Sequence, residues 1–158
     1  MIRFEKARLA DAEVLAEVSK RAFDHDIYYG APGPGGPPGY DSAAWQAKVM
    51  RFGEYYKILE GKRIIGGMVI MRRGAREYEV ARIFIEPEWQ DRGIGTGAFE
   101  FLWEKYSLAK RWTLDTPAWN RRTRHFYKKL GFVECGEDGD GSILFERRIQ
   151  TGTLEPGS

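Results

Sequence analysis

The chain has little of several features that define whole classes of protein. Cys135 is the only cysteine, which excludes an internal disulfide and favours a reducing compartment; we expect it to be a small buried hydrophobe. No uncharged run is long enough to span a bilayer, and residues 1–6 lack the apolar core of a signal peptide. The 25 basic and 23 acidic residues leave a net charge of +2, so no strong field is available to bind a polyanion. We therefore expect a cytoplasmic protein that binds neither nucleic acid nor membrane.

The remaining composition is typical of a folded protein, with 42% apolar and 30% charged residues in a chain of 158. We expect one domain over residues 1–150 and a disordered tail over 151–158. Hydrophobic periodicity, caps and turn residues predict an α+β order, with three meander strands followed by β-α-β-α-β. The predicted strands are 2–6, 55–60, 63–71, 78–85, 112–115, 132–135 and 142–147. Four helices are predicted. The first begins after Asp11 and has an apolar face of Val14, Leu15, Val18, Ala22 and Phe23, and the second begins after Asp41 or Ser42. The third follows the glycine segment and runs to Tyr106, and the fourth opens at Thr116-Pro117 and ends at Gly131.

Residues 30–39 read G-A-P-G-P-G-G-P-P-G and hold four of the seven prolines. Nothing regular can form in such a stretch. It is flanked by aromatic residues on both sides, Tyr28 and Tyr29 before it and Tyr40 and Trp45 after it. The segment is either a surface loop or a lid over a small-molecule site, since long loops in compact domains are often functional.

Three alternate glycines, at 93, 95 and 97, stand directly before an amphipathic helix. Glycine weakens a helix by up to about 1 kcal/mol per residue, so something should require them. One explanation is close backbone packing. The other is a bound phosphate, because the first N–H groups of a helix have no internal partner and the helix dipole favours an anion there.

Two familiar phosphate motifs fit this segment poorly. A P-loop needs Lys and then Ser or Thr after its second glycine, and both are missing here. The dinucleotide fingerprint fits Gly93-x-Gly95-x-x-Ala98 with Asp115 downstream, but Glu86 to Arg92 separate the strand from the first glycine. A Rossmann-type dinucleotide binder is therefore only a minor alternative.

A third motif fits better. Pro87-Glu88-Trp89-Gln90-Asp91-Arg92-Gly93-Ile94-Gly95 resembles motif A of the GNAT superfamily of acyl-CoA-dependent N-acetyltransferases, whose core is Gln/Arg-x-x-Gly-x-Gly/Ala. A second block, Asn120-x-x-Thr123-x-x-x-Tyr127-x-Lys129-x-Gly131-Phe132, is similar to the motif that follows in this family. The resemblance covers essentially residues 2–149. Thr123 departs from the usual alanine or serine, and we expect this change to cost some closeness to the cofactor.

The resemblance implies a three-layer fold in which a mixed, mostly antiparallel sheet of about seven strands is flanked by about four helices. It also implies that the strand ending at Ile85 parts from the one at Trp112, and that the pantetheine arm of acetyl-CoA lies between them. The Ile85 amide would then polarise the thioester carbonyl. The implied coenzyme-binding residues are Ile83, Phe84, Ile85, Gln90, Asp91, Arg92, Gly93, Ile94, Gly95, Thr96, Gly97, Asn120, Phe126, Tyr127 and Lys129.

The family's general acid corresponds to Tyr127, seven residues after Asn120. A phenol pKa near 10 and a thiol pKa near 8.5 make full proton transfer uphill by about 2 kcal/mol, so hydrogen bonding to the leaving sulfur can contribute as much as protonation. A primary amine with a pKa near 10.4 also needs a base. Glu79 is the first candidate, because alternation places it on one strand face with Ala81, Ile83 and Ile85. Glu86 and His125 follow.

Other charged residues have less specific roles. Asp24, Asp26, Tyr28 and Tyr29 precede the proline-glycine loop, where this family commonly builds its acceptor pocket, and they suit a cationic amine. Arg82 is expected to pair with an acid or, second, to bind a substrate carboxylate. The helix after Asn120 carries a basic patch, of which we assign one or two members to the coenzyme 3′-phosphate and the rest to solvent: Arg121, Arg122, Arg124, Lys128 and Lys129.

The sequence thus predicts an N-acetyltransferase that transfers an acetyl group from acetyl-CoA to an amine by direct attack, without a metal. The acceptor is a small molecule or a peptide, and the protein is a monomer or a homodimer. The alternative is a non-catalytic acyl-CoA-binding regulatory domain.

Overall fold

A meander of three antiparallel strands forms the centre of the molecule. In the computed structural model, which describes residues 1–149, these are β2 (Glu54–Glu60), β3 (Arg63–Gly74) and β4 (Glu77–Ile85). The middle of β3 is buried almost continuously, as expected for a central strand with both faces covered. The predicted tail, 151–158, lies outside the described residues.

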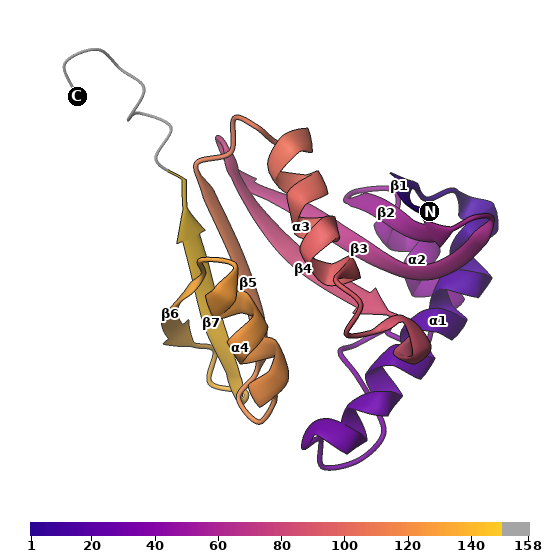
Figure 1. Cartoon of the computed structure of the whole chain (residues 1–158), viewed down its shortest axis with the longest axis horizontal. Coiled ribbons are helices and arrows are strands. Elements are labelled where there is room, and N and C mark those ends of the chain that lie inside the picture. The colour runs from indigo at the N-terminus through magenta and orange to yellow at the C-terminus, as the bar shows by residue number, and fades with distance from the viewer. Residues whose placement is uncertain (150–158) are drawn as a thin grey trace.

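Four more strands extend the meander into a seven-stranded sheet with the order β1-β2-β3-β4-β5-β7-β6 (Figure 1). They are β1 (Ile2–Lys6), β5 (Arg111–Pro117), β6 (Val133–Glu137) and β7 (Ser142–Arg148). Every neighbouring pair is antiparallel except β4 and β5, which are parallel. The expected mixed, mostly antiparallel α+β fold is confirmed.

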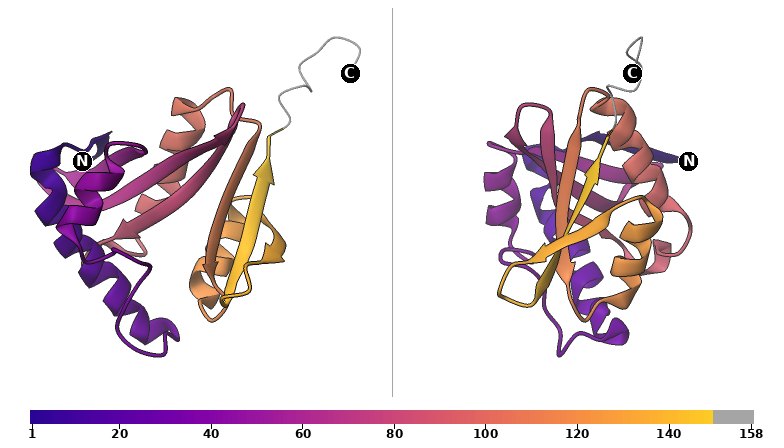
Figure 2. Two further views of the ribbon diagram at one scale, coloured as in Figure 1. Left: turned by 180° about the vertical axis from the view of Figure 1, so that it is seen from behind. Right: turned by 90° about the vertical axis from the view of Figure 1, so that its left-hand side faces the viewer.

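Helices cover both faces of the sheet (Figure 2). One face packs on α1 (Ala12–Asp24) and α2 (Ala43–Val49), and the other on α3 (Ile94–Lys105) and α4 (Arg121–Lys129). Short 3-10 turns precede α1, follow it and precede α3, at Leu9–Asp11, His25–Tyr29 and Pro87–Trp89. Within residues 1–149, none of the helices combines the length and apolar character needed to cross a bilayer.

The two helix layers enclose separate apolar cores. Leu15 and Val18 of α1 meet Phe84 of β4 in one core, while Phe99 and Leu102 of α3 lie in the other. Val14 is 42% exposed, so its predicted place on the buried face of α1 is wrong; the helix buries a narrower stripe. Cys135 is exposed on β6, an edge strand, so its predicted burial is also wrong.

The helix ends follow the capping residues, with two exceptions. Ser42 caps α2 by accepting from the Trp45 N–H, and Gly131 ends α4 with the Phe132 N–H bonded to the Tyr127 carbonyl. Asp11 stands at the start of α1, but its carboxylate accepts from Lys57 and from the Arg8 N–H instead of capping the helix.

The second exception concerns the start of α4. The prediction that Thr116-Pro117 opens this helix is wrong, because both residues pair with β7 as the end of β5. A proline is tolerated there, since the last residue of a strand can do without an N–H donor. Asn120 caps α4 instead, its side-chain oxygen accepting from the Thr123 N–H at 3.1 Å.

Candidate active site

The turn before α3 presents a row of free backbone donors. No N–H group from Asp91 to Thr96 has a hydrogen-bond partner among residues 1–149, and no side chain caps the helix. Asp91 and Gly93 both adopt left-handed backbone conformations, with φ of 61° and 79°. Such alternation turns successive N–H groups toward one concave side, which is a typical anion-binding arrangement. Added to the positive end of the α3 dipole, it makes this turn suited to a phosphate.

The three glycines of this turn have different structural reasons. At Gly93 an added Cβ would meet nothing within 4 Å, and only the positive φ favours glycine. At Gly95 a Cβ would lie 3.0 Å from Cζ of Phe126, so a side chain there would crowd the packing of α3 against α4. At Gly97 the nearest atom would be Cζ of Phe4 at 3.9 Å, an ordinary contact. Close backbone packing, one of the two explanations offered by the sequence, therefore applies to Gly95, while Gly93 is favoured by its backbone conformation.

β4 and β5 diverge directly beside this turn. Their parallel pairing is limited to three residue pairs, of which Glu79–Thr113 is the last. Beyond this pair, β4 continues to Ile85 and β5 to Pro117 without pairing with each other (Figure 1). The Glu86 N–H bonds to Ile65 of β3, so the preceding amide, that of Ile85, faces the β5 side. The Ile85 carbonyl on that side accepts from the Gln90 side chain at 2.9 Å.

A β-bulge in β4 changes which side chains share a face. Val69 of β3 pairs with Arg82 and Ile70 pairs with Val80, so Ala81 is an extra residue. Ile83 and Ile85 consequently pack toward α3 and α4, whereas Ala81 and Phe84 pack toward α1 and α2. The prediction that Glu79, Ala81, Ile83 and Ile85 share one face is wrong for this reason. The Phe84 side chain is buried in the core under α1 and α2, and its carbonyl points toward Gly66 of β3, so Phe84 presents no side chain to the space between β4 and β5.

The two carboxylates among the candidate bases already form ion pairs. Glu79 accepts from Arg73 of β3, with the Nη2–Oε1 distance 2.5 Å. Glu86 is 4% exposed and forms a two-point ion pair with Arg21 of α1, at 2.7 and 2.9 Å. His125 lies on the exposed side of α4.

Tyr127 is the buried polar side chain of α4. It is 7% exposed and packs among Phe99, Phe126, Phe132 and Phe145, yet its hydroxyl has no hydrogen-bond partner among residues 1–149. Burial raises its pKa, the carboxylates of Asp115 and Asp26 raise it further, and Arg122 opposes them. The phenol is therefore neutral and near those carboxylates. Asn120, also buried, caps α4 with its side-chain oxygen, so it stands immediately before the helix that carries Tyr127.

Arg122 connects α4 to the turn before α3, a contact that the sequence did not indicate. It donates to the Gln90 side chain at 2.8 Å, approaches the Asp91 carboxylate at 3.5 Å, and stacks on the Tyr29 ring at 4.3 Å. Gln90 in turn donates to the Ile85 carbonyl, so a continuous series of hydrogen bonds joins α4, the turn before α3 and the end of β4. These hydrogen bonds connect the β4 side and the β5 side of the sheet at the end where the two strands diverge.

The four acceptor candidates divide into two pairs. Asp26 and Tyr29 lie beside Arg122, whose charge opposes the burial that raises the Asp26 pKa. Asp24 instead accepts from Tyr40 at 2.8 Å and from Lys20 at 2.6 Å, which fastens the far end of the proline-glycine loop to α1. Tyr28 is 77% exposed. Asp24 and Tyr28 line a separate open cavity of about 600 Å³ outside α1.

Asp115 of β5 is a further candidate residue, for which the sequence assigned no catalytic role. It is the first residue on its strand face beyond the last β4 pair, Thr113. Partial desolvation by the surrounding protein raises its pKa although the residue reaches solvent, and Glu79 and Asp138 raise it further. Its signal in the sequence was weak, because a single aspartate at the end of a strand is common.

Comparison with known proteins bears on this site. The model of the acetyltransferase (GNAT) domain matches residues 51–134, more than half of the chain and the whole stretch from β2 to α4. The chain belongs to the GNAT acetyltransferase family. It is therefore an acetyl-CoA-dependent N-acetyltransferase, and its seven-stranded sheet with one parallel pair excludes the open parallel sheet of a Rossmann domain.

Solved structures share the GNAT fold along nearly the whole chain. The PaiA N-acetyltransferase from Thermoplasma acidophilum, in complex with coenzyme A, is 18% identical with a TM-score of 0.79, covering 94% of this chain and 99% of that one. An acetyltransferase from Thermus thermophilus is 15% identical with a TM-score of 0.79, covering 94% and 97%. The ribosomal-protein-S18-alanine N-acetyltransferase from Escherichia coli is 17% identical with a TM-score of 0.73, covering 94% of each chain. No curated protein matches the chain.

The basic patch of this GNAT domain is largely committed to its own fold. Arg124 and Lys128 both pair with Glu134 of β6, at 3.0 and 3.4 Å, and Arg122 donates to Gln90. Lys129 is exposed at the last turn of α4. Arg92 stacks on Trp89 at 4.8 Å beside the free N–H groups. Thr123 bonds Thr116 of β5 at 2.6 Å, which fixes α4 to the strand beneath it.

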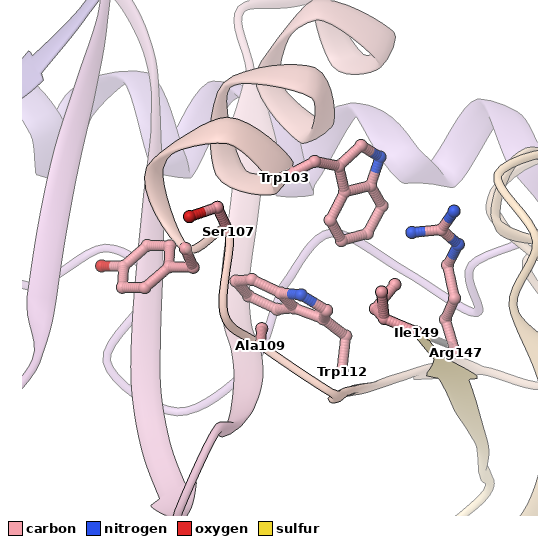
Figure 3. A pocket seen from close by; sticks show the side chains of 7 residues that line it. Trp103, Ser107, Ala109, Trp112, Arg147 and Ile149 are labelled. Carbon is pink, nitrogen blue, oxygen red and sulfur yellow. The ribbon is translucent and has the colours of Figure 1, made fainter. Parts of the chain in front are cut away.

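A small cavity of about 220 Å³ lies at the opposite end of α3 (Figure 3). Trp103, Trp112, Arg147 and Ile149 line it, and the Arg147 guanidinium stacks on Trp103 at 4.4 Å. Because Trp112 lies in the part of β5 that is still paired with β4, this cavity is at the closed end of the splay. It is separate from the site at Gly93 and Tyr127.

Proposed function

We propose that the chain acetylates a primary amine by direct attack on acetyl-CoA in a ternary complex, with a small molecule or a peptide as acceptor. The observation that carries this proposal is the row of unpartnered N–H groups from Asp91 to Thr96, located where β4 and β5 diverge. These groups hold the coenzyme diphosphate, and Arg92 beside them adds positive charge. The backbone of Ile83–Ile85 guides the pantetheine arm, and the Ile85 N–H polarises the acetyl carbonyl.

Tyr127 stabilises the leaving sulfur in this proposal. The amine nitrogen forms the new C–N bond, the C–S bond breaks, and the sulfur leaves with the bonding electron pair. Burial keeps the phenol neutral and raises its pKa further above that of a thiol, so Tyr127 serves mainly as a hydrogen-bond donor to the sulfur. Its lack of another partner among the described residues leaves the hydroxyl available for this role.

Asp115 receives the proton that the amine loses. Asp115 lies just beyond the last residue pair of β4 and β5, on the sheet face that carries α1 and α2. The coenzyme binds on the other face, which α3 and α4 cover. Its raised pKa makes it a stronger base than an ordinary aspartate. Glu79, held by Arg73, raises that pKa and remains the alternative base.

The test is thiol release from acetyl-CoA across a panel of amines. We expect turnover with wild-type protein, and a decrease in kcat of about 100-fold in Tyr127→Phe, the usual size of a general acid–base contribution. Asp115→Asn should be impaired far more than Glu79→Gln if Asp115 is the base. Tight binding of coenzyme A without turnover on any amine would instead support a regulatory acyl-CoA-binding domain.

A cytoplasmic location is part of the same proposal, because the exposed thiol of Cys135 remains reduced in that compartment.

A further inference from the structure

Arg82 and Asp115 occupy matching positions on the two diverging strands. Glu79 and Thr113 form the last registered pair of β4 and β5. Asp115 is the next residue on the same face of β5, and the bulge at Ala81 makes Arg82 the corresponding residue of β4. Both side chains lie on the face that carries α1 and α2, opposite the helices beside the coenzyme turn. An acceptor that approaches from this face therefore meets a cation on one strand and a carboxylate on the other.

The Arg82 guanidinium is held in place without being neutralised. It stacks on the Trp45 ring of α2 at 4.2 Å and donates to the Pro38 carbonyl at 2.8 Å. No carboxylate of the described residues lies within 4 Å of it, so the prediction that Arg82 pairs with an acid is wrong. A carbonyl and an aromatic ring orient the guanidinium while leaving its charge and several N–H donors available.

Asp115 is the carboxylate on this face that has no compensating partner. Glu79 pairs with Arg73, and Asp138 accepts from the N–H groups of Asp140 and Ser142. No cation of residues 1–149 lies within 4 Å of Asp115. Yet Arg82 and Asp115 influence one another: burial lowers the pKa of Arg82 and Asp115 opposes this, while Arg82 opposes the rise in the pKa of Asp115. The two charges thus influence one another from the two diverging strands without forming an ion pair.

We propose that the acceptor is a free α-amino acid, whose carboxylate binds Arg82 while its amine points to Asp115 and the acetyl group. This proposal rests on the proposed function and names its substrate class. An α-amino acid carries opposite charges on neighbouring atoms and matches the pair of opposite protein charges. A polyamine would bring a second cation toward Arg82, and a peptide N-terminus or a simple amine would leave the guanidinium without a counter-charge.

The proline-glycine loop belongs to this arrangement. Pro38 is one of its last residues, and its carbonyl bond to Arg82 joins the loop directly to the acceptor side of the sheet. Gln46 of α2 also donates to the Gly39 carbonyl, at 3.3 Å. The proline-glycine loop therefore positions the carboxylate-binding Arg82. This assigns the loop a role in the acceptor site and not that of a simple surface loop.

The test compares matched acceptors, each free amino acid against its own α-carboxamide. The carboxamide has the less basic amine and is more often neutral at pH 7, so a preference for the free acid must come from recognition of the carboxylate. We expect higher kcat/KM for at least one free amino acid than for its carboxamide. In Arg82→Gln this preference should fall by about 10- to 100-fold through the KM of the free acid, the usual loss for a hydrogen bond to a charged group.

Arg72→Gln is the matched control, because Arg72 lies exposed on the neighbouring strand, with Gly74 as its hydrogen-bond partner, and should keep the preference. Arg82→Lys, which retains the charge, should keep part of it even if Arg82→Gln is less stable. Equal use of acids and carboxamides by wild-type protein would overturn the amino-acid assignment and leave acetyl transfer intact. Absence of thiol release with every amine, together with absence of coenzyme A binding, would overturn the proposed function and this assignment with it.

Discussion

The ring of Phe126 on α4 lies against the bare backbone of Gly95 on α3, where an added Cβ would be 3.0 Å from Cζ. This contact packs the second turn of α4 against the first turn of α3, beside the free N–H groups from Asp91 to Thr96. Gly97, two residues later, has no such neighbour.

The two glycines should therefore respond oppositely to alanine. Gly97→Ala should stabilise the protein by about 0.5–1 kcal/mol, because alanine is the better helix former and its Cβ has room. Gly95→Ala should destabilise it by about 1 kcal/mol, since the overpacking at Phe126 outweighs the same gain. Urea unfolding of both variants measures this difference. Equal stabilisation by both substitutions would show that Phe126 does not constrain this turn.

Arg122→Gln should weaken coenzyme A binding by about tenfold, the value of a hydrogen bond involving a charged group. The substitution removes the charge that approaches Asp91 and the contact that positions Gln90. Arg121→Gln is the control, because Arg121 precedes Arg122 on α4 but is exposed, and this variant should bind the coenzyme as wild type does. Calorimetric titration distinguishes the two, and equal weakening in both variants would indicate only a loss of general positive charge.

The raised pKa of Asp115 predicts how kcat/KM falls at low pH. A base must be ionised to act, so kcat/KM should rise with pH through a pKa above the ordinary aspartate value of about 3.9. An acceptor with a weakly basic amine, already neutral over this range, isolates the enzyme's own ionisation. Asp115→Asn should lose the acid limb as well as activity, whereas Glu79→Gln should keep the limb and shift it to lower pH, because a neighbouring negative charge is removed. An unchanged limb in Asp115→Asn would assign the base elsewhere.

Asp11 and Lys57 predict a pH-dependent contribution to stability. Burial raises the Asp11 pKa, but the hydrogen bonds from Lys57 and Arg8 outweigh it and the net pKa is lowered. The stabilisation is therefore present above the unfolded value of 3.8 and is lost as pH falls through the lower folded value. Asp11→Asn leaves Lys57, 7% exposed, without its counter-charge and should cost about 3 kcal/mol at pH 7.

The measurement for this pair is urea unfolding at several pH values, and the difference from wild type should shrink as the pH falls below about 3.8. Glu88→Gln breaks an ion pair whose side chains are both 57% exposed, and it serves as the control with a small effect at every pH. A cost for Asp11→Asn that stays constant with pH would mean that the charge of Asp11 is not what stabilises the fold.

Local patterns were sufficient for the strands and for most helix ends. The alternation of apolar and polar residues located β2, β3 and β4. Ser42 and Gly131 form their capping contacts with residues a few positions away, and the turn before α3 is recognisable from its glycines. The beginning of α4 was misplaced because Pro117 suits both a strand end and a helix start, and only its pairing with β7 decides between them.

The remaining features depend on contacts between distant segments. The bulge at Ala81 follows from the register of β4 on β3, which alternation within β4 does not contain, and it reverses the face of every side chain beyond it. Arg122 meets Gln90 across 32 residues of sequence, and Arg82 binds a carbonyl 44 residues away. The charges of these residues were visible in the sequence, but their partners were not.

The central claim is that the N–H groups from Asp91 to Thr96 hold the coenzyme diphosphate. Titrating ¹⁵N-labelled protein with coenzyme A, and separately with pantetheine, which lacks the diphosphate, tests it most directly. Coenzyme A should shift the amide signals of Gly93, Gly95 and Thr96 strongly, and pantetheine should shift only those near Ile83–Ile85. If coenzyme A binds and leaves the signals of Gly93 to Thr96 unmoved, the claim is wrong.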